Sequence, residues 1–169
     1  MEGNSITKLT SKAHVAAHIL AVWFGVGLLP RAPGTWGSLA ALPLAYSLAY
    51  WGGIEVLTVA TIIIFVIGVW VSGVVSRELG VSDPSKIVID EVAGQWLTLL
   101  AVPPDIILYL FGFFLFRIFD IFKPWPISWA DKQIKGGMGI MLDDIIAGIY
   151  AGIFLWAGNF IFLTYNLVN

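Results

Sequence analysis

The sequence RIFDIFKPWPISWADKQIKGGMGIMLDD, residues 117–144, best indicates both the fold and the site, because it gathers charge in a chain that otherwise avoids it. Of the 169 residues, 59% are hydrophobic and 12% are charged, and the mean hydropathy is +0.89. This window holds eight of the twenty charged residues (nine basic and eleven acidic). A charge at the centre of a membrane helix costs about 2.5–3.5 kcal/mol, so clustered acids and bases indicate a polar site.

The composition outside this window is typical of an integral membrane protein, since an average soluble chain is about 25% charged. The net charge of −2 offers no basic surface for nucleic acid, and the absence of cysteine excludes a thiol nucleophile. The first apolar stretch, residues 13–29, contains His14 and His18 and lacks a signal-peptide cleavage site. We expect one domain, residues 13–165, after a flexible N-terminus, residues 1–12.

Apolar stretches predict an all-α integral membrane bundle with four or five membrane-embedded helices. Residues 56–76 and 145–164 are the clearest spans, because each is uncharged and about 20 residues long, the length that a bilayer requires. The other stretches are residues 13–29, 38–51, 87–102 and 106–122. Whether residues 13–29 span the membrane is left open by their length.

Basic residues predict the orientation of this bundle. The connections at residues 52–55 and 103–105 contain no Lys or Arg, whereas the loops at the other ends of the spans contain Arg31, Arg77, Lys86, Lys123, Lys132 and Lys135. The positive-inside rule places these basic loops in the cytoplasm. The same topology brings all the polar motifs to that face.

The motif PRAPGTWGS, residues 30–38, suggests an anion site. Pro33-Gly34 fits the central pair of a type II turn, in which the glycine has positive φ. Thr35 or Ser38 can then cap the next helix, whose free N–H groups favour phosphate. An ordinary loop and cap explain the same residues.

The motif KIVIDEVAGQW, residues 86–96, places Asp90 and Glu91 in an apolar run. Adjacent carboxylates are costly there unless a cation or base partners them. Gly94 follows Asp90 by one helical turn and permits another helix to approach closely. The alternative is a helix start near water, where the dipole favours acids.

The window itself contains two further motifs. In RIFDIFKPWP, Arg117, Asp120 and Lys123 form one stripe and Pro124 ends the helix. The stripe is either a row of ion pairs or a metal ligand between two phosphate binders. In GGMGIMLDDIIAG, the glycines can aim N–H groups at an anion, and Asp143 and Asp144 open the last span or serve as dipole partners. Gly148 and Gly152 indicate helix packing.

Together these motifs predict metal-assisted phosphoryl chemistry on a membrane substrate. Oxygen ligands suit Mg²⁺, and Arg117 and Lys123 suit phosphate oxygens. The carboxylates expected to converge are Asp90, Glu91, Asp120, Asp143 and Asp144.

The ordered set PRAPGTWGSLAALP, IVIDEVAG, RIFDIFKPWPI and GGMGIMLDDIIAG closely resembles the phosphatidylglycerophosphatase A family, from about His18 to Gly152. The resemblance implies a bacterial inner-membrane, Mg²⁺-dependent enzyme that converts phosphatidylglycerophosphate to phosphatidylglycerol, which feeds cardiolipin synthesis. By motif, Asp90-Glu91 matches the family's DE pair, Asp120 and Lys123 its FDxxKP, and Asp143-Asp144 its DD pair.

We therefore expect the five carboxylates to be the metal-binding and catalytic residues, and a water to attack the phosphorus. Thr35, Ser38, Arg117 and Lys123 are the expected phosphate-binding residues. The signatures of haloacid-dehalogenase-like and histidine-dependent lipid phosphatases are missing from the sequence.

Three other functions fit the sequence less well. Phosphatidyl transfer from a CDP-lipid lacks its expected DGxxAR…GxxxD…D pattern. A transporter predicts mid-span charges and inverted repeats, whereas these acids lie at the ends of spans. A purely structural membrane protein leaves the charge cluster unexplained.

Overall fold

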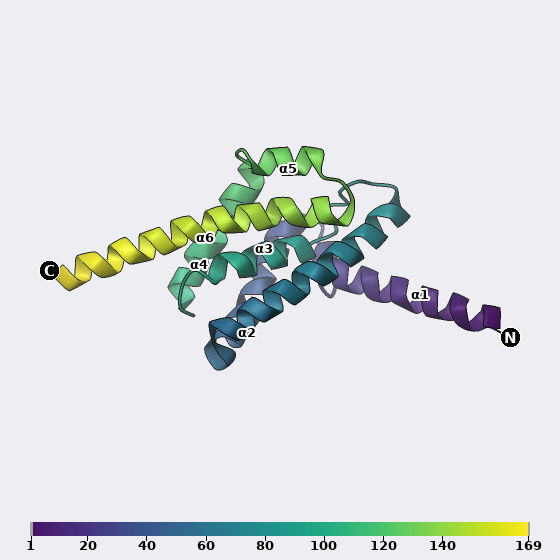
Figure 1. The fold of residues 1–169 in the computed structure, drawn as a ribbon, viewed down its shortest axis with the longest axis horizontal. Helices are drawn as coiled ribbons and strands as arrows, with labels where there is room; N and C mark the ends of the chain where they lie inside the picture. The colour runs from purple at the N-terminus through teal and green to yellow at the C-terminus, as the bar shows by residue number, and fades with distance from the viewer. Residues whose placement is uncertain (1, 169) are drawn as a thin grey trace.

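The computed structural model describes the backbone of residues 2–168 and the side chains of residues 12–167. The protein is 81% helical, and the described residues form no strand, which confirms the all-α prediction. In chain order the elements are α1 (Glu2–Ala21), the short 3₁₀ helix η1 (Val26–Leu28), α2 (Pro33–Leu79), α3 (Ile89–Leu99), α4 (Ile106–Phe122), α5 (Ile127–Gln133) and α6 (Gly136–Val168) (Figure 1).

Helix α2 consists of two arms rather than one rod. Gly53 has φ 76° and ψ 176°, a backbone shape that glycine adopts without a Cβ penalty, and it interrupts the helical conformation. Figure 1 shows the chain reversing direction there, so residues 33–52 form a first arm and residues 54–79 a second arm. These arms match the predicted apolar stretches 38–51 and 56–76.

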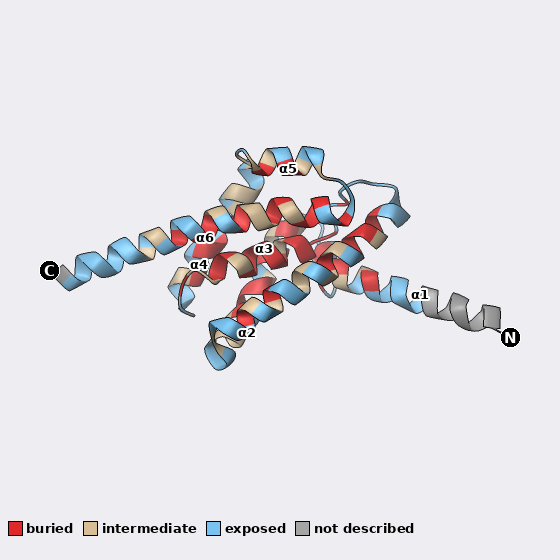
Figure 2. Cartoon of the chain, viewed as in Figure 1, coloured by how far each residue is buried: buried red, intermediate tan, exposed pale blue. Residues whose placement is uncertain are grey.

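Helix α3 lies at the centre and makes its most extensive contacts with α2 and α6. Figure 2 shows it almost wholly buried. The Trp96 indole Nε1 donates a hydrogen bond to the Ala41 carbonyl of the first arm at 3.0 Å. A Cβ on Gly148 would lie 2.5 Å from the Gly94 carbonyl oxygen, so α6 approaches α3 at two glycines. The predicted packing roles of Gly94 and Gly148 are confirmed.

Two helices, Pro33–Leu79 and Gly136–Leu167, are long and apolar enough to cross a membrane. Their outward faces are apolar, as Ile62 (58% exposed) and Phe162 (66% exposed) illustrate. Soluble monomers rarely expose large contiguous apolar patches, so these faces indicate association with a membrane.

The bundle has two chemically different ends. At the polar end, the start of the first arm meets α3, and the end of the second arm meets the start of α6, where Gly73 lies against Gly137. The opposite end contains Gly53 and the α3–α4 connection, where Leu57, Leu99 and Tyr109 line one pocket. The loops that carry the sequence motifs therefore gather at one end of the fold.

Two predicted boundaries differ clearly from the structure, and one short helix was not predicted. Helix α1 ends at Ala21, so residues 13–29 are not one helical stretch: Trp23, Phe24 and Gly25 all have positive φ and turn the chain. Helix α6 begins at Gly136, nine residues before the expected span. The short helix α5 was not predicted. The flexibility of residues 1–12 and the domain limits 13–165 stay predictions.

Candidate active site

A cavity of about 240 Å³ opens at the polar end, between the start of the first arm, the α2–α3 loop, and helices α3, α4 and α6. Five segments that are distant in sequence contribute to it. Its polar lining consists of Asp83, Ser85, Asp90, Glu91, Arg117, Asp120, Lys123, Asp143 and Asp144. All five predicted carboxylates and both predicted basic residues therefore share one cavity.

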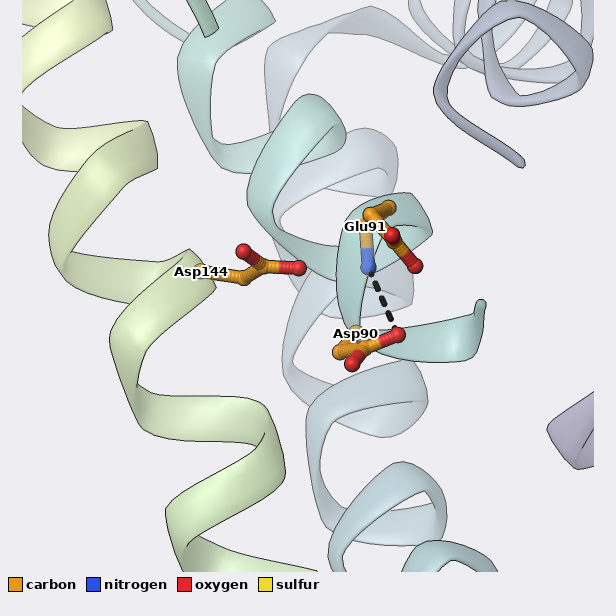
Figure 3. Close-up of side chains that lie close together, drawn as sticks. All are labelled: Asp90, Glu91 and Asp144. Carbon is orange, nitrogen blue, oxygen red and sulfur yellow. Dashed lines mark hydrogen bonds between the residues drawn. The ribbon is translucent and has the colours of Figure 1, made fainter. Parts of the chain in front are cut away.

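Three of these carboxylates form a tight group, the carboxylate triad of Asp90, Glu91 and Asp144. One carboxylate oxygen from each lies within 4.8 Å of the other two. Figure 3 shows Asp90 and Glu91 on the first turn of α3 facing Asp144 on α6, with the Glu91 N–H donating to Asp90 Oδ1 at 3.1 Å. Asp90 and Asp144 are 8% and 4% exposed.

The protein places little positive charge and few hydrogen-bond donors beside the triad to balance its negative charge. Among the described residues, Glu91 Oε2 is buried without a hydrogen-bond partner. The one cation close to the Glu91 carboxylate among the described residues is Arg117, whose Nη1 lies 3.7 Å from Glu91 Oε1. Like charges gathered away from water repel and lose hydration, so this arrangement favours a bound cation.

Arg117 links the triad to the first arm. Its Nη1 forms an ion pair with Asp120, one turn further along α4, and lies 3.4 Å from the Ser38 hydroxyl oxygen. The Arg117 side chain is only 14% exposed. Asp120 therefore fixes the direction of the guanidinium instead of joining the triad.

Lys123 forms a second charged group at the cavity edge. Its Nζ donates to Asp131 Oδ1 at 2.7 Å and to Asp143 Oδ2 at 2.6 Å. Burial by itself lowers the pKa of Lys123, but these two carboxylates outweigh it and the pKa lies above its usual value. Lys123 therefore remains a cation at neutral pH.

The predicted stripe on α4 thus divides into two groups. Arg117 pairs with Asp120, whereas Lys123 ends the helix with φ 42° and turns toward α5 and α6. The predicted end of the helix at Pro124 is confirmed, since α4 ends at Phe122.

The first motif is folded differently from the prediction. Pro33 and Gly34 begin α2 instead of forming a type II turn, and the positive φ (48°) belongs to Ala32. No side chain caps this helix start. The Ser38 hydroxyl donates to the Gly34 carbonyl oxygen at 2.9 Å inside the helix, and Thr35 is not among the residues lining the cavity.

Gly34 has a role that the turn prediction missed. A Cβ at this position would lie 1.8 Å from Glu91 Oε1, so glycine lets the helix start approach the triad. The missing side chain leaves room for the Glu91 carboxylate.

The glycines in the first turn of the last helix, α6, pack closely against neighbouring backbone instead of forming an exposed loop. A Cβ on Gly137 would lie 1.9 Å from the Val69 carbonyl oxygen, and one on Gly139 would lie 2.1 Å from that of Ile134. Because α6 begins at Gly136, Asp143 and Asp144 lie about two turns inside it. The reading of these acids as partners of the helix dipole is therefore wrong, whereas Asp90 and Glu91 do lie in the first turn of α3.

Sequence reasoning did not select two acids beside the site, Asp83 and Asp131. Asp83 lines the cavity from the α2–α3 loop, and burial raises the pKa of its carboxyl above the ordinary value. Asp131, on α5, binds Lys123. The signal for Asp131 was present, because it is one of the charges in the window at residues 117–144.

Comparison with known proteins assigns the family. The sequence profile described as Phosphatidylglycerophosphatase A matches residues 19–159. The chain belongs to this family. It is 44% identical to the Phosphatidylglycerophosphatase A of Escherichia coli (strain K12), over 84% of this chain and 83% of that protein. It is 39% identical to the Haemophilus influenzae protein of the same name, over 92% of this chain and 95% of that protein.

A third family relative has another name. A Bacteroides thetaiotaomicron protein, provisionally named a phosphatidylinositol-3-phosphatase, is 38% identical over 81% of this chain and 89% of its own length. No solved structure gives a significant match. These relatives identify the chain as a phosphatase.

Proposed function

We propose that this phosphatase hydrolyses phosphatidylglycerophosphate to phosphatidylglycerol and inorganic phosphate in the polar-end cavity, with Mg²⁺, as a step of phospholipid and cardiolipin biosynthesis. The observation that carries the proposal is the meeting of a carboxylate triad and two basic side chains in one cavity of a family member. Hydrolysis of a phosphomonoester uses both groups. The carboxylates can bind a metal cation, and this cation and the basic side chains neutralise the phosphate charge as the reaction proceeds.

The triad fits Mg²⁺ by its donor chemistry. Asp90, Glu91 and Asp144 offer only oxygen atoms, which Mg²⁺ prefers, and Glu91 Oε2 is buried without a hydrogen-bond partner in the described part of the chain. A bound Mg²⁺ would supply charge neutralisation and lower the pKa of a coordinated water. We narrow the predicted metal set to this triad, since Asp120 and Asp143 already bind basic side chains.

Arg117 and Lys123 are the proposed phosphate-binding residues. Both line the cavity, and each is held by carboxylates that leave further N–H groups for phosphate oxygens. Ser38 supports this site through its contact with Arg117, whereas the structure offers no comparable contact for Thr35 within the described cavity lining.

The proposed chemical step is attack of a water oxygen on phosphorus. The bond from phosphorus to the glycerol oxygen breaks, and that oxygen leaves with a proton as the phosphatidylglycerol hydroxyl. A carboxylate of the triad accepts the proton that the water loses and delivers it to the departing glycerol oxygen, so the carboxylate is restored at the end of the step. The buried site limits access of bulk water, which strengthens each of these electrostatic contacts.

The substrate suggests how the protein sits in a membrane. We propose a multi-pass protein of the bacterial cytoplasmic membrane, with the two arms of α2, helix α4 and helix α6 embedded. Helix α4 presents Phe111 (58% exposed) and Phe114 (60% exposed) outward, as a lipid-facing helix does. The basic loops share the polar end, so the positive-inside rule puts the cavity at the cytoplasmic face.

The Bacteroides relative raises a second candidate substrate, a phosphoinositide. The names of the three relatives all describe phosphatases of phospholipid headgroups, and they differ in the headgroup that carries the phosphate. The same cavity chemistry would therefore serve either substrate. The two substrates are therefore compared in one experiment.

Purified protein in detergent is given phosphatidylglycerophosphate or phosphatidylinositol 3-phosphate, each with Mg²⁺ or with EDTA, and phosphate release is measured. The proposal predicts Mg²⁺-dependent release with a higher kcat/KM for phosphatidylglycerophosphate. A higher kcat/KM for the phosphoinositide would make that lipid the proposed substrate. Equal phosphate release in EDTA would show that the reaction does not require Mg²⁺. No release from either lipid by folded protein would overturn the proposed reaction.

A further inference from the structure

Lys123 is held at the cavity edge by a residue outside the family motifs that first indicated the site. The Lys123 Nζ lies between Asp143 on α6 and Asp131 on α5, at 2.6 Å and 2.7 Å. Asp143 belongs to the predicted acid set, but Asp131 does not. Helix α5 thus contributes a charged contact at the edge of the site.

The main chain around Lys123 does not by itself fix the amine. Lys123 is the residue after α4, in the left-handed region with φ 42°, and a four-carbon stem separates its amine from that backbone. An unrestrained lysine side chain samples many rotamers, so ordering it costs free energy. Two carboxylates from different helices remove that freedom.

Geometry also limits what Asp131 itself can touch. It is 35% exposed and lines a neighbouring space of about 30 Å³, next to Asp83 and Asp143, but it does not line the 240 Å³ cavity. Its route to the cavity is therefore through Lys123. Two of the three ammonium N–H groups point to Asp131 and Asp143, which leaves the third for a phosphate oxygen.

We propose that Asp131 is a positioning residue, which orients the Lys123 ammonium toward the substrate phosphate without touching the substrate itself. This inference rests on the proposed function, because it assigns Lys123 to phosphate binding. The inference also assigns a role to helix α5, which carries Asp131. The buried Ile127 and Ala130 side chains anchor this helix to the bundle.

The test is a double-mutant cycle on purified protein with phosphatidylglycerophosphate and Mg²⁺. Asp131→Asn should lower kcat/KM about 10-fold, mainly by raising KM, and should raise the inhibition constant of inorganic phosphate by a similar factor. In a Lys123→Met background the same substitution should change kcat/KM less than about twofold, because its target is gone. Asp131→Glu should restore most of the loss.

The matched control is Lys132→Gln, an exposed neighbour on the same helix, which should leave both constants unchanged. Should Asp131→Asn fail to fold, Asp131→Ser takes its place in the cycle. Equal losses from the Asp131 change with and without Lys123, or an unchanged phosphate inhibition constant, would overturn the inference. Wild-type protein that releases no phosphate would instead overturn the proposed function, so the two failures are distinguishable.

Discussion

The two groups of acids in the cavity differ in how the protein compensates their charge. Asp120 and Asp143 each bind a basic side chain, whereas Asp90, Glu91 and Asp144 face one another with Arg117 as their one nearby cation among the described residues. The sequence groups all five by motif, but their partners separate them. Asp120 and Asp143 orient basic side chains. Among the described residues, the triad has one longer ion pair, from Arg117 to Glu91 at 3.7 Å, and is left for a metal ion.

The largest expected effect separates the two groups by activity. Asp144→Asn and Asp90→Asn should lower kcat/KM on the order of 1,000-fold, because each removes a proposed metal ligand. Asp143→Asn should cost roughly 10- to 100-fold, since it acts through Lys123. Steady-state kinetics with phosphatidylglycerophosphate checks this order. Equal losses of kcat/KM in all three variants would contradict the division into metal-binding acids and acids that orient basic side chains.

Arg117→Lys sharpens the comparison from the basic side. Lysine keeps the charge but loses the guanidinium Nη1 group that contacts Asp120, Ser38 and Glu91, so kcat/KM should fall on the order of 100-fold. Thermal unfolding should show that the variant is folded. Wild-type kinetics in this variant would mean that a point charge is sufficient there.

Gly34→Ala displaces the triad without removing a charge. The new methyl group would meet Glu91 Oε1, the far end of a flexible side chain, so the carboxylate should move and activity should fall about 10-fold with little loss of stability. Gly73→Ala is the matched control, because its nearest contacts at 3.5 Å are ordinary ones. Equal activity in both variants would show that the position of Glu91 is unimportant.

Stability should distinguish the groups with opposite signs. In EDTA, Asp144→Asn should raise the midpoint of thermal unfolding, because it removes one of three repelling buried carboxylates. Asp143→Asn should lower the midpoint, since it removes a partner of Lys123. Both midpoints are measured in the same detergent, and changes of the same sign would contradict the assignment of partners.

The opposite end of the bundle should give the smallest effect on catalysis. Asp105 caps α4 there, with Oδ1 accepting from the N–H groups of Ile107 and Leu108 at 2.9 Å. Asp105→Ala should cost about 1 kcal/mol of stability and leave kcat/KM unchanged. Lost activity at full stability would mean that this end communicates with the site.

The sequence predicted much of the helical framework because hydropathy reports burial and lipid contact directly. The stretch 106–122 matches α4 residue for residue. The sequence failed where a backbone turn or a distant partner decides the outcome. Trp23 and Phe24 adopt positive φ after α1, and the hydropathy of residues 13–29 contains no sign of that turn.

The sequence predicted the five carboxylates and two basic residues of the candidate site, but not their contacts, the lining by Asp83 or the exclusion of Thr35 from the cavity lining. The five carboxylates share a cavity as expected, because their motifs lie at the same ends of the apolar stretches. Spacing along α4 could not show that Lys123 turns away from Asp120, since the turn depends on the left-handed residue and on α5. Likewise, only the fold shows that Gly34 faces Glu91.

The central claim, that the carboxylate triad binds Mg²⁺, is tested most directly by thermal unfolding at increasing Mg²⁺ concentration without substrate. A ligand that binds the native state raises its stability by mass action. Mg²⁺ should raise the midpoint of the wild-type protein and of Asp120→Asn, and should leave Asp90→Asn and Asp144→Asn nearly unchanged. Equal stabilisation of all four proteins, or of none, would contradict the assignment of the metal site to Asp90, Glu91 and Asp144.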